Sequence, residues 1–126
     1  MSGTSMLVLT PAYNCREKLW RTMLSVAGQS YDNWRMVVID DVSDDGTAEA
    51  ASGYAERLGV SEKVTIIKRK EKYGEVRNTL DIVNNVAEDD EVIVRLDAGD
   101  YLVDLDALAI INTLYSNTKP KPAVLG

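Results

Sequence analysis

The sequence contains no histidine and a single cysteine, Cys15, among its 126 residues. Without histidine, the chain lacks the most common general base and the most common zinc ligand. Acid-base or metal chemistry would therefore have to use carboxylates, and oxygen ligands favour a hard cation. One cysteine cannot form an internal disulfide, which fits a reducing, cytoplasmic compartment. We interpret Cys15 itself as incidental, because no histidine is present to form an ion pair with it.

Long apolar runs and an excess of basic residues are also missing. No run approaches the roughly 20 apolar residues that span a bilayer, and Met1–Ser5 lacks the features of a secretory signal. With 14 basic and 20 acidic residues, the net charge is -6, which disfavours nucleic acid as a partner. One basic cluster, at 68–72, is either a solvated strand end or an attraction for an anionic ligand. Residues 1–126 have the length of one ordinary domain.

Apolar patterns along the chain alternate between two periods. Strands are expected near Met6–Thr10, Trp34–Ile39, Val64–Lys68 and Val92–Leu96. Helical stripes fall between them, with members that include Trp20, Met23, Leu24, Ala51, Ala55, Val76, Leu80, Val83, Ala87, Leu105, Leu108, Ile110, Ile111 and Leu114. This order predicts an α/β fold, a mostly parallel sheet with helices on both faces. We expect Trp20 and Met23 in the core, and another strand beginning at Ala123. A sheet edge left there would favour homo-oligomers.

Polar loops follow three of these strands. Their sequences are Pro11-Ala12-Tyr13-Asn14, Asp40-Asp41-Val42-Ser43-Asp44-Asp45-Gly46-Thr47 and Asp97-Ala98-Gly99-Asp100-Tyr101-Leu102. Parallel strands open their carboxyl ends at one edge of a sheet, so the three loops are predicted to form one site. The first loop has neither the glycine-rich basic sequence of a nucleotidyltransferase nor the G-x-G-x-x-G of a dinucleotide-dependent oxidoreductase.

Residue chemistry indicates what such a site could bind. Asp41 suits the imide N–H of uracil or a similar base, and Tyr13 suits its flat face, although an acidic solvated loop and a half-buried loop aromatic would carry the same residues. A diphosphate would be repelled by Asp97 and Asp100 unless a divalent cation lay between them. We assign Asp104 and Asp106, just beyond, to a turn or a helix N-terminus.

These motifs, in this order, resemble those of family 2 glycosyltransferases of the GT-A fold. The family's typical forms are P-x-Y-N, V-D-D-x-S-x-D-G-T and D-x-D-D-x-L, together with an Arg-Asn pair that opens a helix, matched here by Arg77-Asn78. The resemblance runs from about Met6 to the end of the chain and identifies it with the N-terminal, nucleotide-sugar-binding part of such an enzyme. Two departures stand out: Gly99 replaces the first of two adjacent Asp residues, and the family's catalytic domain is substantially longer, so we expect the acceptor-binding half to be absent.

The resemblance implies the activity and the residues that serve it. It implies metal-dependent, inverting transfer of a sugar from a nucleoside diphosphate donor, a UDP-sugar, to a glycan or other hydroxyl acceptor, as in polysaccharide biosynthesis. The implied substrate-binding residues are Pro11, Ala12, Tyr13, Asn14, Asp41, Arg77 and Asp97, and the implied ligand of Mn²⁺ or Mg²⁺ is Asp100. No residue of the chain is a candidate for the general base. The alternative is a non-catalytic nucleotide-sugar-binding or interaction module, which the missing half and Gly99 both favour.

Overall fold

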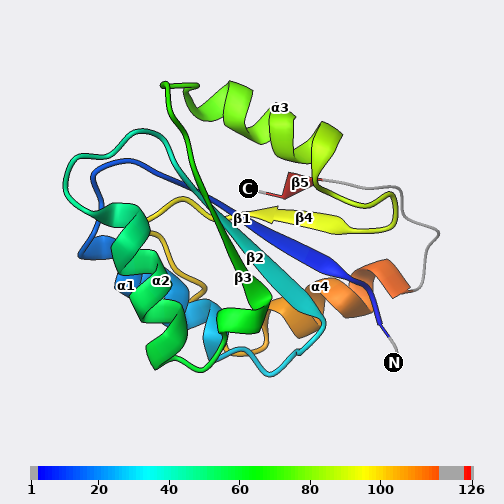
Figure 1. Cartoon of the computed structure of the whole chain (residues 1–126). Helices are drawn as coiled ribbons and strands as arrows, with labels where there is room; N and C mark the ends of the chain where they lie inside the picture. The colour runs from blue at the N-terminus through cyan, green and yellow to red at the C-terminus, as the bar shows by residue number, and fades with distance from the viewer. Residues whose placement is uncertain (1–2, 117–123, 126) are drawn as a thin grey trace.

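Strands and helices alternate along the chain, as the sequence predicts. The structure is a computed structural model and describes residues 3–116 and 124–125. The strands are β1 (Met6–Ala12), β2 (Trp34–Asp40), β3 (Val64–Lys68), β4 (Val92–Arg95) and β5 (Val124–Leu125). The helices are α1 (Lys18–Ala27), α2 (Thr47–Arg57), α3 (Glu75–Asn85) and α4 (Ala107–Ser116), with a 3-10 turn at Ser61–Lys63. The strands are parallel and lie in the order β3-β2-β1-β4-β5 (Figure 1).

The central strand β1 determines where the polar loops lie. Its carboxyl end is level with that of β2, because Ala12 is paired with Asp40. On its other side β1 pairs with β4, and beyond this pairing the amide of Ala98 donates to the carbonyl of Pro11 over 3.3 Å. The loops that follow β1, β2 and β4 therefore lie together at one edge of the sheet, as predicted.

Helices cover both faces of the sheet, and alternate residues of its strands supply the two cores. On one face, α1, α2 and α4 pack over side chains that include Met6, Val8, Met36, Val38, Val92 and Val94. On the other face, α3 packs over Leu7, Leu9, Val37, Ile39 and Ile93 (Figure 1). Because both faces of β1, β2 and β4 are buried, these strands have nearly continuous apolar sequences rather than alternating ones.

The prediction for the buried face of α3 is wrong in part. Val76 and Leu80 belong to the predicted apolar stripe, but their side chains are 74% and 54% exposed. The buried residues of this helix are Asn78 and Ile82, which are also four positions apart and so share a face. Val83 and Ala87 of the same stripe do pack against the core as partly buried side chains, so the prediction fails at Val76 and Leu80. The other predicted stripes also have exposed members, namely Leu24, Leu105, Ile110 and Leu114. Spacing identifies residues on a common side of a helix, but not which side meets the sheet.

Two further expectations concern α1 and the C-terminus. Met23 is buried in the core as expected, whereas Trp20 is only half-buried and packs edge-on against Tyr54 of α2, with ring centroids 5.3 Å apart. The predicted strand start at Ala123 lies outside the described residues, and β5 pairs Val124 with Ile93 of β4. Among the helices within 3–116, none is long and apolar enough to cross a membrane.

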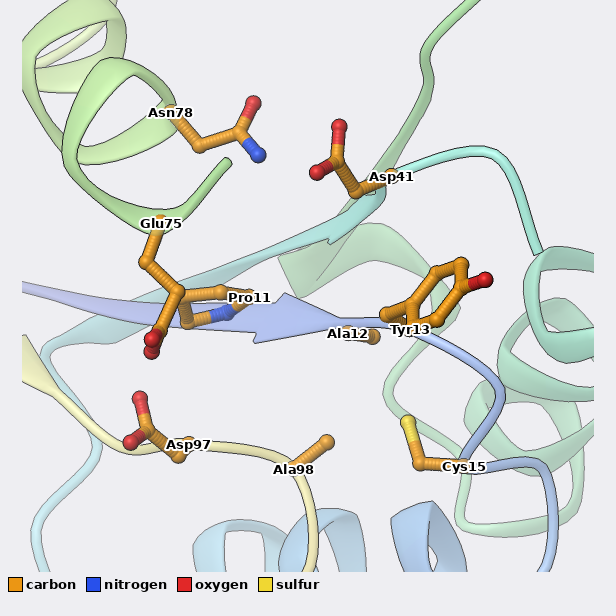
Figure 2. Close-up of a pocket in the computed structure, with 9 residues that line it drawn as sticks. All are labelled: Pro11, Ala12, Tyr13, Cys15, Asp41, Glu75, Asn78, Asp97 and Ala98. Atoms are coloured by element: carbon orange, nitrogen blue, oxygen red, sulfur yellow. The ribbon is translucent and has the colours of Figure 1, made fainter. Parts of the chain in front are cut away.

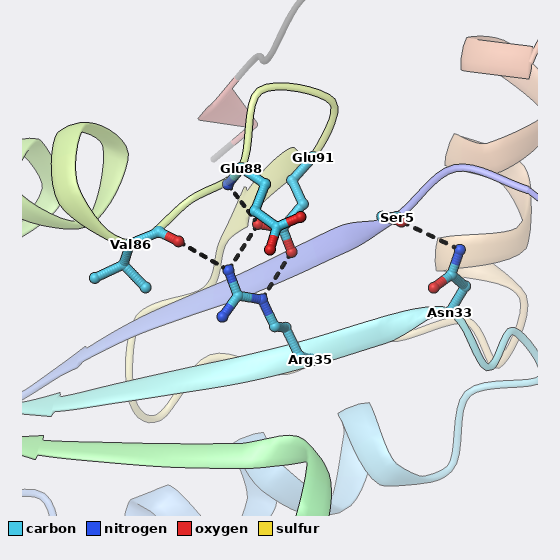
Figure 3. A network of polar contacts seen from close by, with 6 residues as sticks. All are labelled: Ser5, Asn33, Arg35, Val86, Glu88 and Glu91. Carbon is cyan, nitrogen blue, oxygen red and sulfur yellow. Dashed lines mark hydrogen bonds and ion pairs between the residues drawn. The ribbon is translucent and has the colours of Figure 1, made fainter.

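A partly buried ion pair lies at the opposite, amino-terminal edge of the sheet (Figure 3). The guanidinium of Arg35 on β2 donates to both carboxylate oxygens of Glu91 over 2.8 Å, and it also donates to the carbonyl of Val86 over 3.0 Å. The amide of Glu88 donates to the same carboxylate. Burial alone would raise the pKa of Glu91, but the hydrogen bonds from Arg35 and the Glu88 amide hold that pKa below its ordinary value.

This ion pair predicts a pH-dependent contribution to stability. We expect Glu91→Gln to lower the free energy of unfolding at pH 7 by about 1 to 2 kcal/mol, a value reduced because Arg35 is partly exposed to solvent. Because the folded-state pKa is depressed, the contribution is present above the ordinary pKa of 4.5 and is lost as the pH falls through the lower folded value.

Urea unfolding at pH 7 and at pH 3 measures this difference. Glu88→Gln is the matched control, because it removes a carboxylate from the same turn but no hydrogen bond to Arg35. A deficit of Glu91→Gln that stayed constant from pH 7 to pH 3 would contradict the assignment.

Candidate functional site

A cavity of about 200 Å³ opens at the carboxyl edge of the sheet. Its walls come from the loops after β1, β2 and β4 and from the first turns of α3 (Figure 2). The lining residues are Pro11, Ala12, Tyr13, Cys15, Asp41, Glu75, Asn78, Asp97 and Ala98. Five predicted site residues, Pro11, Ala12, Tyr13, Asp41 and Asp97, are thus brought together, whereas Asn14, Arg77 and Asp100 are not among the lining residues.

Asp41 follows the last residue of β2 and holds the segment that leads into α3. Its two carboxylate oxygens accept the amides of Tyr73 and Gly74 over 2.8 and 2.9 Å. Burial raises the pKa of Asp41. These two amides, the Asn78 side chain and nearby Lys72 lower that pKa by more, so it lies below its ordinary value. The carboxylate is therefore ionised at neutral pH and held by backbone amides, and it lines the cavity.

The acidic loop after β2 is more than a solvated surface loop. Four carboxylates within six residues require hydrogen-bond donors among them, and the structure supplies donors to three. The amide of Ser43 donates to Asp40 over 3.0 Å, and the amides of Arg16 and Thr47 donate to Asp45. The bond from Arg16 joins the loop after β2 to the loop after β1, and the other two bonds hold the loop after β2 in its own shape.

Asn14 belongs to this rim rather than to the cavity lining. Its side-chain oxygen accepts the amide of Asp44 over 2.9 Å, and its own amide donates to the hydroxyl of Ser43. Nearby, Val42 has φ +66°, a left-handed conformation that a β-branched residue rarely adopts. Such strained positions persist where surrounding contacts enforce them, and they cluster at functional sites.

Cationic side chains stand over the aromatic rings beside the cavity. The Lys72 ammonium lies 3.4 Å from the centre of the Tyr13 ring, and the guanidinium of Arg77 lies 3.7 Å from that of Tyr73. Arg69 also stacks on Tyr73 and donates to the Asn78 side chain over 2.9 Å. Of the basic cluster at 68–72, Arg69 and Lys72 thus make defined contacts next to the cavity.

The loop after β4 places two carboxylates within one turn. The amide of Asp100 donates to the carbonyl of Asp97 over 2.9 Å. Asp97 lines the cavity, and its Oδ1 atom is buried with no hydrogen-bond partner within the described residues. Asp100 is exposed. The same Oδ1 atom lies 3.1 Å from Nη2 of Arg95, which partly balances its charge. Asp97 and Asp100 offer the oxygen ligands that a hard divalent cation takes.

Neighbouring polar groups behave as expected for a turn. Asp104 accepts the amide of Asp106 over 2.8 Å, and Asp106 accepts the hydroxyl of Ser30. Both carboxylates are therefore engaged at the start of α4, in agreement with their assignment to a turn or helix N-terminus. Over residues 3–116 and 124–125, no three His, Cys, Asp or Glu side chains are grouped to hold a metal.

Sequence reasoning missed part of the cavity wall. Glu75 and Asn78 line it, and Asn78 is buried, yet only the Arg-Asn pair that includes Asn78 gave a signal in the sequence. Cys15, interpreted as incidental, also lines the cavity, and burial raises the pKa of its thiol. A raised pKa keeps the thiol protonated at neutral pH, which argues against a nucleophilic role.

Gly99 occupies a backbone conformation that suits glycine. Its φ is +100°, its amide donates to the Thr22 hydroxyl over 2.8 Å, and its carbonyl accepts a hydrogen bond from the Arg21 guanidinium over 2.9 Å.

This conformation predicts the effect of a side chain at position 99. We expect Gly99→Asp, which restores the acidic pair of the motif, to lower the free energy of unfolding by about 1 to 3 kcal/mol. Thermal or urea unfolding measures this, and Gly99→Ala is the control for strain without charge. Unchanged stability in both variants would contradict the strained geometry.

Comparison with known proteins assigns the family. The family model for glycosyl transferase family 2 matches residues 7–118. The chain belongs to this family. It is 36% identical over 69 residues to the glycosyltransferase EpsE of Bacillus subtilis, and 34% identical over 67 residues to the teichuronic acid biosynthesis glycosyltransferase TuaG of the same organism. These matches cover 55% and 53% of the chain but only 24% and 25% of the relatives, about a quarter of their length.

Solved structures of glycosyltransferases have the same fold. The mannosyltransferase PcManGT from Pyrobaculum calidifontis, in complex with GDP-Man and Mn²⁺, matches 95% of the chain and 34% of its own length with a TM-score of 0.79 at 22% identity. S. aureus TarS 1–349 in complex with UDP-GlcNAc matches 90% of the chain and 31% of its own length with a TM-score of 0.71 at 20% identity. The family 2 chain thus has the Rossmann-like α/β fold of the GT-A glycosyltransferases, over about a third of these two structures.

Proposed function

We propose that this family 2 chain is the donor-binding part of a glycosyltransferase that transfers a sugar from a nucleoside diphosphate to a hydroxyl acceptor. The observation that carries the proposal is the cavity at the carboxyl edge of the sheet, to which the loops after β1, β2 and β4 and the start of α3 all contribute. Open α/β sheets bind ligands in such a crevice.

The base and ribose would lie against the loops after β1 and β2. Asp41 is ionised and can accept the imide N–H of uracil or the N–H groups of guanine. Tyr13 offers a ring face, and the backbone of Pro11 and Ala12 offers polar groups beside it. Asn14 would contribute indirectly, by holding the rim of the cavity through Asp44 and Ser43.

The diphosphate would lie between the cations near α3 and the carboxylates after β4. Arg77 and Lys72 are exposed at the rim and carry positive charge toward an anionic ligand. Asp97 and Asp100 would hold Mg²⁺ or Mn²⁺, with the remaining ligands supplied by diphosphate oxygens. When bound, this cation stabilises the departing nucleoside diphosphate as a Lewis acid. Inverting transfer also needs a base for the acceptor hydroxyl, to which we assign no residue within the described part of the chain.

Calorimetric titration with UDP and with GDP, each in the presence of Mn²⁺, tests this proposal. We expect the diphosphates to bind, and UMP and GMP, titrated in the same way, to bind much more weakly, because the second phosphate supplies further oxygen ligands to the cation. A UDP-sugar is the donor we favour, and the GDP titration decides between the two bases. If neither nucleotide binds, the proposal is wrong.

The second candidate function is nucleotide-sugar binding without transfer. Gly99 favours it, because the acidic pair typical of the family is reduced to one residue here and the backbone at this position disfavours a side chain. Donor hydrolysis, measured as release of UDP from a UDP-sugar, separates the two candidates. Binding without release supports the module, and release supports the transferase.

A further inference from the structure

Arg95, the last residue of β4, connects two carboxylates of the cavity wall. Its Nη2 atom forms an ion pair with Oε1 of Glu75 and a second ion pair, 3.1 Å long, with Oδ1 of Asp97. Figure 2 shows the carboxylates of Glu75 and Asp97 turned toward one another across the cavity. One guanidinium nitrogen therefore serves a residue of α3 and a residue of the loop after β4.

The two halves of this bridge are unequal. The contact of Arg95 with Glu75 is a hydrogen bond, whereas Oδ1 of Asp97 is buried and lacks a hydrogen-bond partner within the described residues, despite its nearness to the guanidinium. The Nε atom of Arg95 is likewise buried without a partner there. The guanidinium is thus bonded to Glu75 and balances Asp97 by charge alone.

We propose that Arg95 is a positioning residue that competes with the divalent cation for the Asp97 carboxylate, and that Glu75 holds Arg95 in this shared position. The inference rests on the proposed function, in which Asp97 helps to hold the cation. A carboxylate that already lies beside a guanidinium attracts a metal ion less strongly, because the positive charge of the guanidinium opposes that of the ion. When the cation binds Asp97, the Arg95 guanidinium stays paired with Glu75, so its partly buried positive charge keeps a partner.

Binding of Mn²⁺ alone, without nucleotide, tests the proposal through the electron paramagnetic resonance signal of the free ion. We expect Arg95→Gln to bind Mn²⁺ about threefold to fivefold more tightly, the range of partly exposed ion pairs. We expect Glu75→Asp to bind it more weakly by a similar factor, because the shorter side chain no longer reaches Arg95, which then relies on Asp97.

Glu75→Asp is the decisive variant, since it preserves charge. If only the summed charge near Asp97 mattered, this variant would bind Mn²⁺ as the unmodified chain does. Lys68→Gln is the control for Arg95→Gln, because it removes a positive charge from the same edge of the sheet, where Lys68 pairs with Glu49 rather than with Asp97. In an Asp97→Asn background, Arg95→Gln should no longer change Mn²⁺ affinity.

The outcomes separate this inference from the proposed function. Equal Mn²⁺ affinity in Glu75→Asp and the unmodified chain overturns the inference, and so does tighter binding in Lys68→Gln that equals that of Arg95→Gln. The UDP and GDP titrations stand apart from these results, so the proposed function can survive either outcome. Failure of every variant, Arg95→Gln included, to bind Mn²⁺ overturns the inference and the metal site together.

Discussion

Replacing Asp41 by alanine is expected to weaken binding of the nucleoside diphosphate by about 1.5 to 3 kcal/mol, the range of a hydrogen bond to a charged group. The variant should also lose stability, since the amides of Tyr73 and Gly74 would both lose their acceptor. Calorimetric titration with UDP and Mn²⁺ measures the first effect, and urea unfolding measures the second. Asp44→Ala is the control, because it removes the same charge from the same loop at an exposed position.

Two roles of Asp41 can be separated by pH and by a milder substitution. Its folded-state pKa is lowered, so its contribution to stability is present above the ordinary pKa of 3.8 and is lost as the pH falls through the folded value. Asp41→Asn keeps one acceptor oxygen for the amides of the loop before α3 but removes the charge. Full stability at pH 7 together with unchanged UDP affinity in this variant would show that Asp41 neither fixes the loop nor binds the base.

The parts of this molecule that follow from local patterns could be predicted from its sequence. Apolar runs that end in Pro11, in Asp40 and Asp41, and near Asp97 predict the strands, and parallel pairing then predicts that their loops meet. The register bears this out, because Ala12 lies beside Asp40. Chain order and local chemistry were sufficient here because each strand and its loop are contiguous.

Contacts between distant segments could not be predicted in the same way. The sequence indicates only that Arg95 belongs to a strand, yet its side chain pairs with Glu75, 20 positions earlier. Asn14 reads as a ligand contact, yet its side chain bonds the amide of Asp44, 30 positions later. In α3, the apolar Val76 faces solvent, although spacing alone placed it in the core. Such choices depend on which face of an element meets the sheet, which no single segment encodes.

Binding of the nucleoside diphosphate should depend on the divalent cation, with Asp100 as its more important protein ligand. Asp97 forms an ion pair with Arg95, whereas the exposed Asp100 side chain has no ion-pair partner within residues 3–116. We therefore expect chelation to weaken UDP binding about tenfold or more, equivalent to about 1.4 kcal/mol. Asp100→Asn should remove this dependence more completely than Asp97→Asn.

Calorimetric titration of UDP in Mn²⁺ and in EDTA, for each variant, gives the required comparison. Asp104→Asn is the control, because that carboxylate lies four residues beyond Asp100 but is occupied by the amide of Asp106. It should retain the full response to Mn²⁺. Because a hard cation needs oxygen ligands from both protein and diphosphate, the response should disappear when either is removed. Equal UDP affinity in Mn²⁺ and in EDTA for the unmodified chain would remove the cation from the site and leave Arg77 and Lys72 as the charges that hold the diphosphate.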